Sequence, residues 1–203
     1  MSSGHRDIIH MSYLLTDNQA SSMGPSRSFQ HPAVKDSLQD LSLLAGVLNG
    51  ILLVTHPGQH QWLSDMLEEL FKRDLSIATW PFISTACQFI ANRDTLYHRD
   101  QHSCLGFYDL LMTFGDYGLE GFLGLRSLGV SLPYDSGTVV LLLARLIEHG
   151  VPRIRGQRFC LSLFNRADVC KCCNGGELPD VSLPDIDDFV GMVDDWVKKV
   201  RTE

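Results

Sequence analysis

The sequence predicts an α+β fold in which helices pack on the outside of an antiparallel β-sandwich or barrel. Three observations predict it: helical apolar spacing early in the chain, a series of short β-prone runs after Pro81, and a length of 203 residues that suits one core. Hydrophobic residues make up 44% of the chain and charged residues 20%, which is typical of a globular protein rather than a disordered or membrane-embedded one.

We divide the chain into three segments. Residues 1–30 are polar and lack apolar periodicity, so we expect a flexible arm there. Residues 31–176 hold the predicted domain, and residues 177–203 form an acidic tail. The arm has no continuous apolar stretch of the kind a secretory signal needs, and the most apolar stretch, residues 41–54, is too short to span a bilayer. We therefore expect an intracellular protein without a membrane segment.

Helical patterns come first along the domain. Apolar residues at helical spacing predict a helix over residues 33–46, ended by a turn at Asn49-Gly50. Residues 51–55 then form a short β-prone run. An amphipathic stripe over residues 62–71 predicts a second helix of about three turns, and we interpret its apolar side chains as core packing.

Short strands are expected in the rest of the domain, separated by turns rich in Gly, Asp, Pro and Ser. The predicted strands span residues 82–91, 107–114, 121–125, 130–132, 138–143 and 159–164. Cys87, Cys104 and Cys160 lie in apolar surroundings, which predicts buried free thiols. Cys170, Cys172 and Cys173 have no second Cys/His cluster nearby to complete a metal site, and we interpret them as a surface thiol cluster.

The charge balance argues against a general electrostatic nucleic-acid binder, because the formal net charge is −7. The charge is uneven, however. Residues 177–203 contain eight acidic and three basic residues, whereas residues 141–176 contain six basic and two acidic ones. A local basic face in an acidic protein therefore remains compatible with weak, salt-sensitive DNA binding.

The residues that suggest chemistry are His98, Asp100 and His149. His98 and Asp100 are two positions apart at the end of a strand-like run, so their side chains point to the same side. Two imidazoles and one carboxylate form the ligand set of non-haem Fe(II) oxygenases. Arg158 opens the last predicted strand, and we expect the strand that ends at His149 to be its partner, so that the guanidinium reaches the same cavity and binds a carboxylate there.

Seven blocks occur in a specific order along the chain: GILLVTHP (50–57), FIANR (89–93), HRD (98–100), YDLL (108–111), YDSGTVV (134–140), HGV (149–151) and RFCL (158–161). In these blocks and their order, the chain resembles the TET/JBP oxygenase family, in particular its fungal branch. The likeness covers roughly residues 45–170. It implies a double-stranded β-helix (jelly-roll) core and oxidation of 5-methyl groups of pyrimidines in DNA with Fe(II), 2-oxoglutarate and O2, with ascorbate as a candidate reductant.

The resemblance also implies roles for individual residues. His98, Asp100 and His149 would bind iron, and Arg158 would anchor 2-oxoglutarate. Asn92 and Arg93 would lie near the other end of the cosubstrate or the substrate pocket. A DNA substrate implies a nuclear protein, and we favour a monomer.

Other residues have two interpretations. A base flipped out of DNA needs stacking and phosphate contacts, and the candidates are Phe107, Tyr108, Tyr117, Arg153 and Arg155, which can equally be core aromatics and solvated charges. His102 is either a partner of the metal site or, as we favour, an exposed loop residue. We also expect an ion pair between Arg145 and Glu148.

Three functions are compatible with the sequence. The first is a dioxygenase that oxidises 5-methylcytosine or a related methylated base in DNA. The second has the same chemistry on RNA or protein. The third is a non-catalytic binding module or a mobile-element relic. The chain retains His98, Asp100, His149 and Arg158 together, which argues against this third function.

Overall fold

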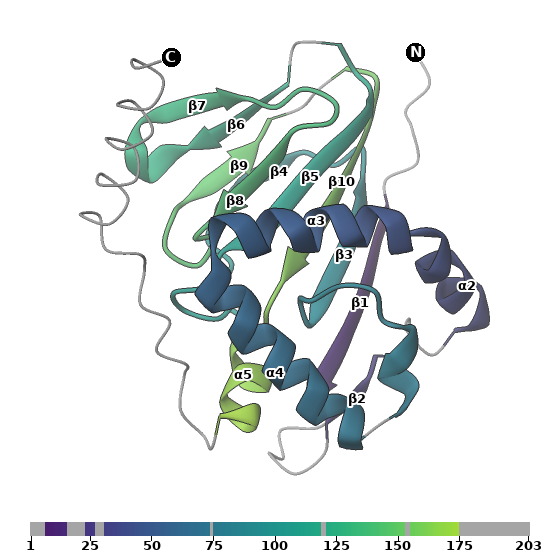
Figure 1. Cartoon of the computed structure of the whole chain (residues 1–203). Coiled ribbons are helices and arrows are strands. Elements are labelled where there is room, and N and C mark those ends of the chain that lie inside the picture. The colour runs from purple at the N-terminus through teal and green to yellow at the C-terminus, as the bar shows by residue number, and fades with distance from the viewer. Residues whose placement is uncertain are drawn as a thin grey trace, which may run out of the picture.

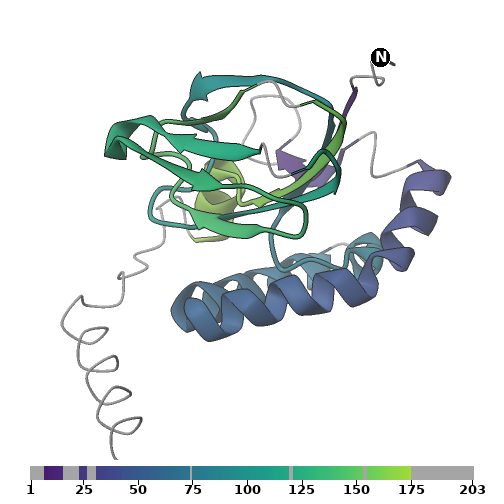
Figure 2. The same cartoon turned by 90° about the horizontal axis from the view of Figure 1, so that it is seen from above.

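Two antiparallel sheets lie face to face, and helices cover the outer face of the larger sheet (Figures 1 and 2). The computed structural model describes residues 7–15, 23–26, 31–73, 75–118, 121–152 and 155–174. The larger sheet has the order β2-β1-β3-β10-β5-β8, and these strands span Met23–Pro25, Asp7–Leu15, Ala86–Ala91, Gln157–Phe164, Asp109–Asp116 and Val139–Leu142. The smaller sheet has the order β4-β9-β6-β7, with spans Thr95–His98, His149–Val151, Phe122–Leu125 and Val130–Pro133.

In the described part of the chain, three helices lie between β2 and β3, and a fourth follows β10. They are α2 (Pro32–Asp40), α3 (Ser42–Thr55), α4 (Pro57–Arg73) and, after the last strand, α5 (Ala167–Cys173). Short 3-10 turns span Leu75–Thr79 and Arg126–Leu128. Figure 2 shows α3 and α4 as a layer on one side of the strands. No helix in the described part of the chain is both long and apolar enough to cross a membrane.

Strand β10 shows how the core positions the site. Leu161 and Leu163 pack with Leu48 of α3, so they face the helices. Ser162 and Phe164 line a cavity on the opposite face. Because successive side chains of a strand point to opposite faces, Arg158 lies on the same face as Ser162. The polar residues of β10 therefore face the smaller sheet, while its leucines hold the helical layer.

The first helical prediction is wrong in detail. Helix α3 continues through Asn49-Gly50 to Thr55, so the predicted turn and the β-prone run at residues 51–55 are helical. The Asn49 side chain donates to the Pro81 carbonyl and accepts from the Ile83 amide, each at 3.1 Å. These two tertiary hydrogen bonds engage the Asn49 side-chain amide, which could otherwise bond the nearby main chain and favour a turn. The second predicted helix is confirmed, and as α4 it is longer than expected.

Part of the expected flexible arm, residues 1–30, is also structured. Strand β1 pairs with β3 from Asp7↔Ala91 to Ser12↔Ala86, and β2 pairs with β1. Main-chain pairing with the edge of a sheet is a tertiary interaction, and the polar composition of the segment does not reveal it. The predicted acidic tail, 177–203, lies outside the described residues.

The six predicted strands are confirmed as β3, β5, β6, β7, β8 and β10, with ends that shift by a few residues. The short strands β4 and β9 were not among them. The strand over Val139–Leu142 ends before a turn, and His149 begins β9 in the other sheet. The expectation that the strands of His149 and Arg158 are partners is therefore wrong, because Arg158 lies on β10 of the larger sheet.

Candidate metal centre and adjoining cavity

His98, Asp100 and His149 come together at the edge of the smaller sheet. His98 ends β4 and His149 begins β9, and the two residues are directly paired across the antiparallel strands. One donor atom from each of the three side chains lies within 4.8 Å of the others. The Nε2 atoms of His98 and His149 lie 3.2 Å and 3.8 Å from the two Asp100 carboxylate oxygens. This arrangement can hold a metal ion.

The two imidazoles are oriented in the same way. Nδ1 of His98 donates to the Leu96 carbonyl at 2.8 Å, and Nδ1 of His149 donates to the Ile147 carbonyl at 3.0 Å. A carbonyl can only accept, so each Nδ1 carries the proton in a neutral ring and each Nε2 presents its lone pair. Metal-binding histidines are commonly held by such a contact. The backbone therefore prepares both rings to coordinate through Nε2.

The two histidines differ in their electrostatics. The hydrogen bond to Asp100 raises the pKa of His98. Burial lowers the pKa of His149, whose side chain is 6% exposed. The lowered pKa favours the neutral form of His149, which metal binding requires, whereas at His98 a metal ion would compete with a proton that is shared with Asp100.

The turn that carries Asp100 is fixed at several points. The Asp100 amide donates to the Ala144 carbonyl, and the Ser103 amide donates to the Asp100 carbonyl, each at 3.0 Å. The Ser103 hydroxyl donates to Oδ2 of Asp109 at 2.6 Å. Nη1 of Arg145 donates to the Ser103 carbonyl at 2.8 Å. Asp100 therefore has a fixed main chain although its side chain is 37% exposed.

Asp109 is a site residue that the sequence did not indicate. It is fully buried at the start of β5, and burial raises the pKa of its carboxyl well above the usual range. Its second oxygen, Oδ1, has no hydrogen-bond partner within the described part of the chain. Asp109 reaches the Asp100 turn only when the chain folds. The one signal in the sequence is that Asp109 is a charged residue in the otherwise apolar run from Tyr108 to Met112.

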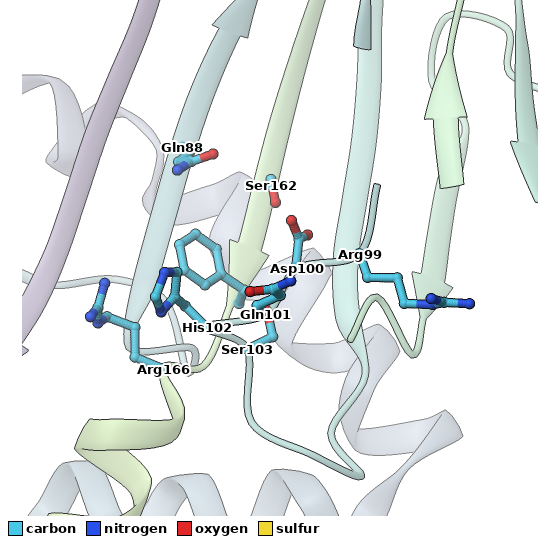
Figure 3. Close-up of a pocket in the computed structure, with 9 residues that line it drawn as sticks. Gln88, Arg99, Asp100, Gln101, His102, Ser103, Ser162 and Arg166 are labelled. Atoms are coloured by element: carbon cyan, nitrogen blue, oxygen red, sulfur yellow. The ribbon is translucent and has the colours of Figure 1, made fainter. Parts of the chain in front are cut away.

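A polar cavity of about 340 Å³ adjoins the Asp100 carboxylate. Figure 3 shows Asp100 and Ser162 pointing toward each other across it, with Gln88 beyond them on the neighbouring strand. The side chains that line the cavity are Gln88, Arg99, Asp100, Gln101, His102, Ser103, Ser162, Phe164 and Arg166. A metal ion bound by the three donors would therefore lie at the edge of this cavity.

Arg158 is buried on the inner face of β10, with 4% of its surface exposed. Its Nη2 donates to the Arg93 carbonyl at 2.9 Å, and its amide donates to Oδ1 of Asn92 at 2.8 Å. Nδ2 of Asn92 also donates to Gln157 at 2.9 Å. Asn92 adopts a left-handed conformation, with φ of 51°, which suits a residue that turns back to bond the neighbouring strand. Asn92 and Arg93 thus contact Arg158 and determine where it lies.

The comparison with known families now decides what the domain is. The family model Tet/JBP, the oxygenase domain of the 2OGFeDO superfamily, matches residues 16–167, which is well over half of the chain. The chain belongs to this family. It therefore contains a 2-oxoglutarate- and Fe(II)-dependent oxygenase domain, which uses 2-oxoglutarate and O2 as cosubstrates. Membership of the fungal branch stays a prediction.

One solved structure confirms the fold of this Tet/JBP domain. NgTET1 in complex with 5mC DNA superposes with a TM-score of 0.62 at 15% identity, covering 82% of this chain. The oxygenase spans 63% of the NgTET1 chain. A Cupin 2 conserved barrel domain protein from Salinispora arenicola CNS-205 covers 44% of this chain and 71% of its own, with a TM-score of 0.32 at 15% identity. No sequence among curated proteins matches significantly. The predicted α+β jelly-roll is thus confirmed.

The donor set fits Fe(II). Two imidazoles and one carboxylate on adjacent elements leave other coordination positions open, which is the arrangement used by non-haem Fe(II) oxygenases. Among the described residues, no other cluster of three His, Cys, Asp or Glu donors comes together. The oxygenase therefore has one candidate iron site in the part of the chain that is described.

Several other predicted site residues have ordinary structural positions. Phe107 and Tyr117 are buried, and Phe107 packs edge-on against Trp62, so neither is free to stack on a base. Tyr108 is half-buried, with its ring centroid 3.9 Å from that of His56. Arg155 is exposed, and Arg153 lies outside the described residues.

The remaining predictions give mixed outcomes. His102 is exposed, as expected, but it lines the cavity. The expected Arg145–Glu148 ion pair is wrong, because Arg145 bonds the Ser103 carbonyl and Glu148 lies 3.8 Å from Arg126. The expected surface thiol cluster is wrong for Cys170, which is buried, whereas Cys172 and Cys173 are half-buried. Cys87, Cys104 and Cys160 are buried free thiols, as predicted.

Proposed function

We propose that this dioxygenase oxidises the methyl group of 5-methylcytosine, or of a related methylated base, in DNA. His98, Asp100 and His149 bind the iron, and Arg158 anchors 2-oxoglutarate. The observation that carries the proposal is the convergence of the three donor atoms beside a polar cavity in a Tet/JBP domain. A DNA substrate would place the enzyme in the nucleus.

Arg158 suits its proposed role because of its burial and its restraints. A buried guanidinium without a carboxylate partner is costly, and a bound carboxylate would relieve that cost. One nitrogen already bonds the Arg93 carbonyl, so the planar group has a fixed direction. Asn92 holds the main chain of Arg158 and acts as a positioning residue.

The protein's part in the reaction is to hold and orient the metal, the cosubstrate and the substrate, and to exclude water from the site. Iron, when bound with 2-oxoglutarate and O2, supplies the oxidising chemistry that hydroxylates the methyl group. The backbone carbonyls of Leu96 and Ile147 keep both imidazoles oriented toward the metal. Asp100 lines the cavity, so a methyl group held there would lie beside a metal ion bound by the three donors.

The cavity determines which substrate group reaches the iron. A base inside duplex DNA must be flipped out to enter it. Gln88 and Ser162 face the cavity from adjacent strands and offer an amide and a hydroxyl, which suit the polar edge of a base. The structure described as NgTET1 in complex with 5mC DNA, which shares the fold, adds support for a DNA substrate. The same cavity would accept a base of single-stranded RNA.

The test is an assay of purified enzyme with Fe(II), 2-oxoglutarate, ascorbate and a DNA oligonucleotide that contains 5-methylcytosine. We expect 5-hydroxymethylcytosine by mass spectrometry, with one succinate formed for each hydroxylation. His98→Ala should abolish both products, whereas Lys72→Gln, an exposed charge change on α4, should leave them unchanged. Succinate formation that is stimulated by methylated RNA or a peptide, but not by methylated DNA, would contradict the proposal. Failure of the wild-type enzyme to bind iron would favour a non-catalytic module.

A further inference from the structure

Two further hollows surround the turn that carries Asp100. One is lined by Arg99, Gln101, Arg145 and Glu148, and the other by Gln101, His102, Arg145, Ala167, Asp168 and Lys171. Gln101 lines both hollows and also the cavity beside the metal site. The three depressions are therefore neighbours around one turn, and a ligand that enters the cavity passes next to the other two.

The charges that line these two hollows do not balance. Glu148 lies 3.8 Å from Arg126, and Asp168 is paired with Arg166 at 2.8 Å, so both acids have a cation of their own. The three remaining cations, Arg99, Arg145 and Lys171, have no carboxylate within ion-pair distance among the described residues. We call these three side chains the turn cations. Together they leave a positive field beside the metal site of an acidic protein.

The two arginines among the turn cations are held in place. Nε of Arg99 donates to the Leu146 carbonyl at 2.9 Å, and Nη1 of Arg145 donates to the Ser103 carbonyl at 2.8 Å. These contacts use only part of the five N–H donors of each guanidinium. Figure 3 shows that Arg99 leaves the turn on the side opposite Arg166. Nη2 of Arg99 also donates to the Ser127 hydroxyl at 3.5 Å, and both guanidinium groups keep further donors that can bind an anion in the hollows that they line.

We propose that the turn cations bind phosphodiester groups of the DNA strand that carries the target base. This inference rests on the proposed function and adds to it the surface that holds the strand. A nucleotide whose base lies in the cavity brings its own phosphates and those of its neighbours to the rim of the cavity, where the hollows lie. Guanidinium and ammonium groups are the side chains that usually contact the DNA backbone, and such contacts position the strand without reading its sequence.

The test measures binding of an unmethylated DNA oligonucleotide to the holoenzyme under anaerobic conditions, by fluorescence anisotropy at several salt concentrations. The variant is Arg99→Gln combined with Lys171→Gln, and the matched control is Lys72→Gln. Loss of two phosphate contacts should weaken binding and reduce the slope of log K against log salt by about 1.8. The control should keep the wild-type slope, because Lys72 pairs with Glu68 and Glu69 on α4. Lys171→Gln alone, at an exposed position, should show half of the change.

Each result separates this inference from the proposed function. An unchanged slope in folded variants overturns the inference, even if 5-methylcytosine is oxidised. A reduced slope supports it even if no oxidised base forms, because the oligonucleotide is unmethylated and the measurement needs no turnover. Binding of a poly-glutamate peptide that is tighter than binding of DNA, and lost in the same variants, would overturn it in favour of an acidic protein partner.

Discussion

At the scale of single residues, the site depends on side chains that never touch the metal. Asp109 accepts a hydrogen bond from Ser103 and lies beneath the Asp100 turn, although its burial is costly. Asn92 bonds the main chain of Arg158 from a left-handed conformation. Both residues restrain the main chain around the candidate site through side-chain hydrogen bonds. Substitution of either residue can test this role.

The first prediction concerns Asp109. Its pKa is raised in the folded protein, so the folded state keeps a proton that the unfolded chain loses above about pH 4. The free energy of unfolding should therefore fall as the pH rises from about 4 toward the folded-state pKa. Asp109→Asn has no proton to lose and can still accept from Ser103, so its stability should depend less on pH.

Urea unfolding of the wild type and of Asp109→Asn between pH 4 and 8 measures this difference. Asp65→Asn, on the surface of α4, is the control, since it removes a carboxyl that is exposed. Parallel pH curves for the wild type and Asp109→Asn would show that the buried carboxyl is not protonated in the folded state.

The second prediction concerns Asn92. Asn92→Ala removes the side-chain hydrogen bonds to Gln157 and to the Arg158 amide at the start of β10 and places alanine at a positive φ, which should destabilise the protein by about 1–3 kcal/mol. Because Arg158 then loses its fixed position, KM for 2-oxoglutarate should rise severalfold while kcat changes less. Asn92→Gly tolerates the positive φ but does not restore the side-chain hydrogen bonds, so stability should recover while KM for 2-oxoglutarate stays raised. An equal KM in all three proteins would exclude a positioning role.

At the scale of elements, the close pairing of β4 and β9 is the feature on which the metal site depends. A Cβ atom at Gly150 would lie 2.9 Å from the Thr95 carbonyl oxygen and 3.1 Å from the Tyr97 nitrogen, both of them main-chain atoms of β4. Neither atom can move without displacing the strand that ends at His98. Glycine is therefore required next to His149 so that the two ligand-bearing strands can approach each other.

The third prediction follows from this packing. Gly150→Ala should separate β4 from β9 and weaken metal binding at least tenfold, measured by calorimetric titration with Mn(II). Gly46→Ala is the control, because nothing lies within 4 Å of the added methyl group and alanine favours the helix. Gly46→Ala should bind Mn(II) like the wild type and be up to about 1 kcal/mol more stable. Equal Mn(II) affinity in both variants would show that the metal site does not depend on the close packing of β4 against β9.

The elements also show what the sequence could predict and what it could not. Strands with clear apolar patterns, such as β5 and β10, were predicted, because their burial is visible in the residues themselves. The short strands β4 and β9 have three or four residues each, too few for a periodic pattern. Asn49-Gly50 predicts a turn locally, but the contact of Asn49 with Pro81 and Ile83 makes it helical.

At the scale of the whole molecule, the spacing of His98, Asp100 and His149 allowed a candidate donor set to be predicted, but not its surroundings. Asp109 and the turn cations come from separate segments, and only folding brings them to one turn. The net charge of −7 likewise says little about the surface beside the site, where three cations have no acidic partner among the residues that the structure describes. Local charge, rather than total charge, is therefore the better guide to what this protein binds.

The fourth prediction is that metal binding stabilises the entire fold. Mn(II), which binds the same donors without redox turnover, should raise the free energy of unfolding by about 2.7 kcal/mol at a concentration of one hundred times Kd. Thermal unfolding with and without Mn(II) measures the effect. His149→Ala should lose the shift in Tm, whereas Lys72→Gln should keep it. A shift that persists in His149→Ala would place the bound metal elsewhere.

The antiparallel pairing of His98 with His149 has a consequence beyond catalysis. These two ligands are far apart in sequence and become neighbours only when β4 and β9 have come together. An unfolded chain therefore offers iron little to hold, and each bound ion favours the folded population by mass action. In a cell short of iron, more of the chain would be in the unfolded form that proteases degrade. Iron availability would then influence the amount of the enzyme as well as its rate.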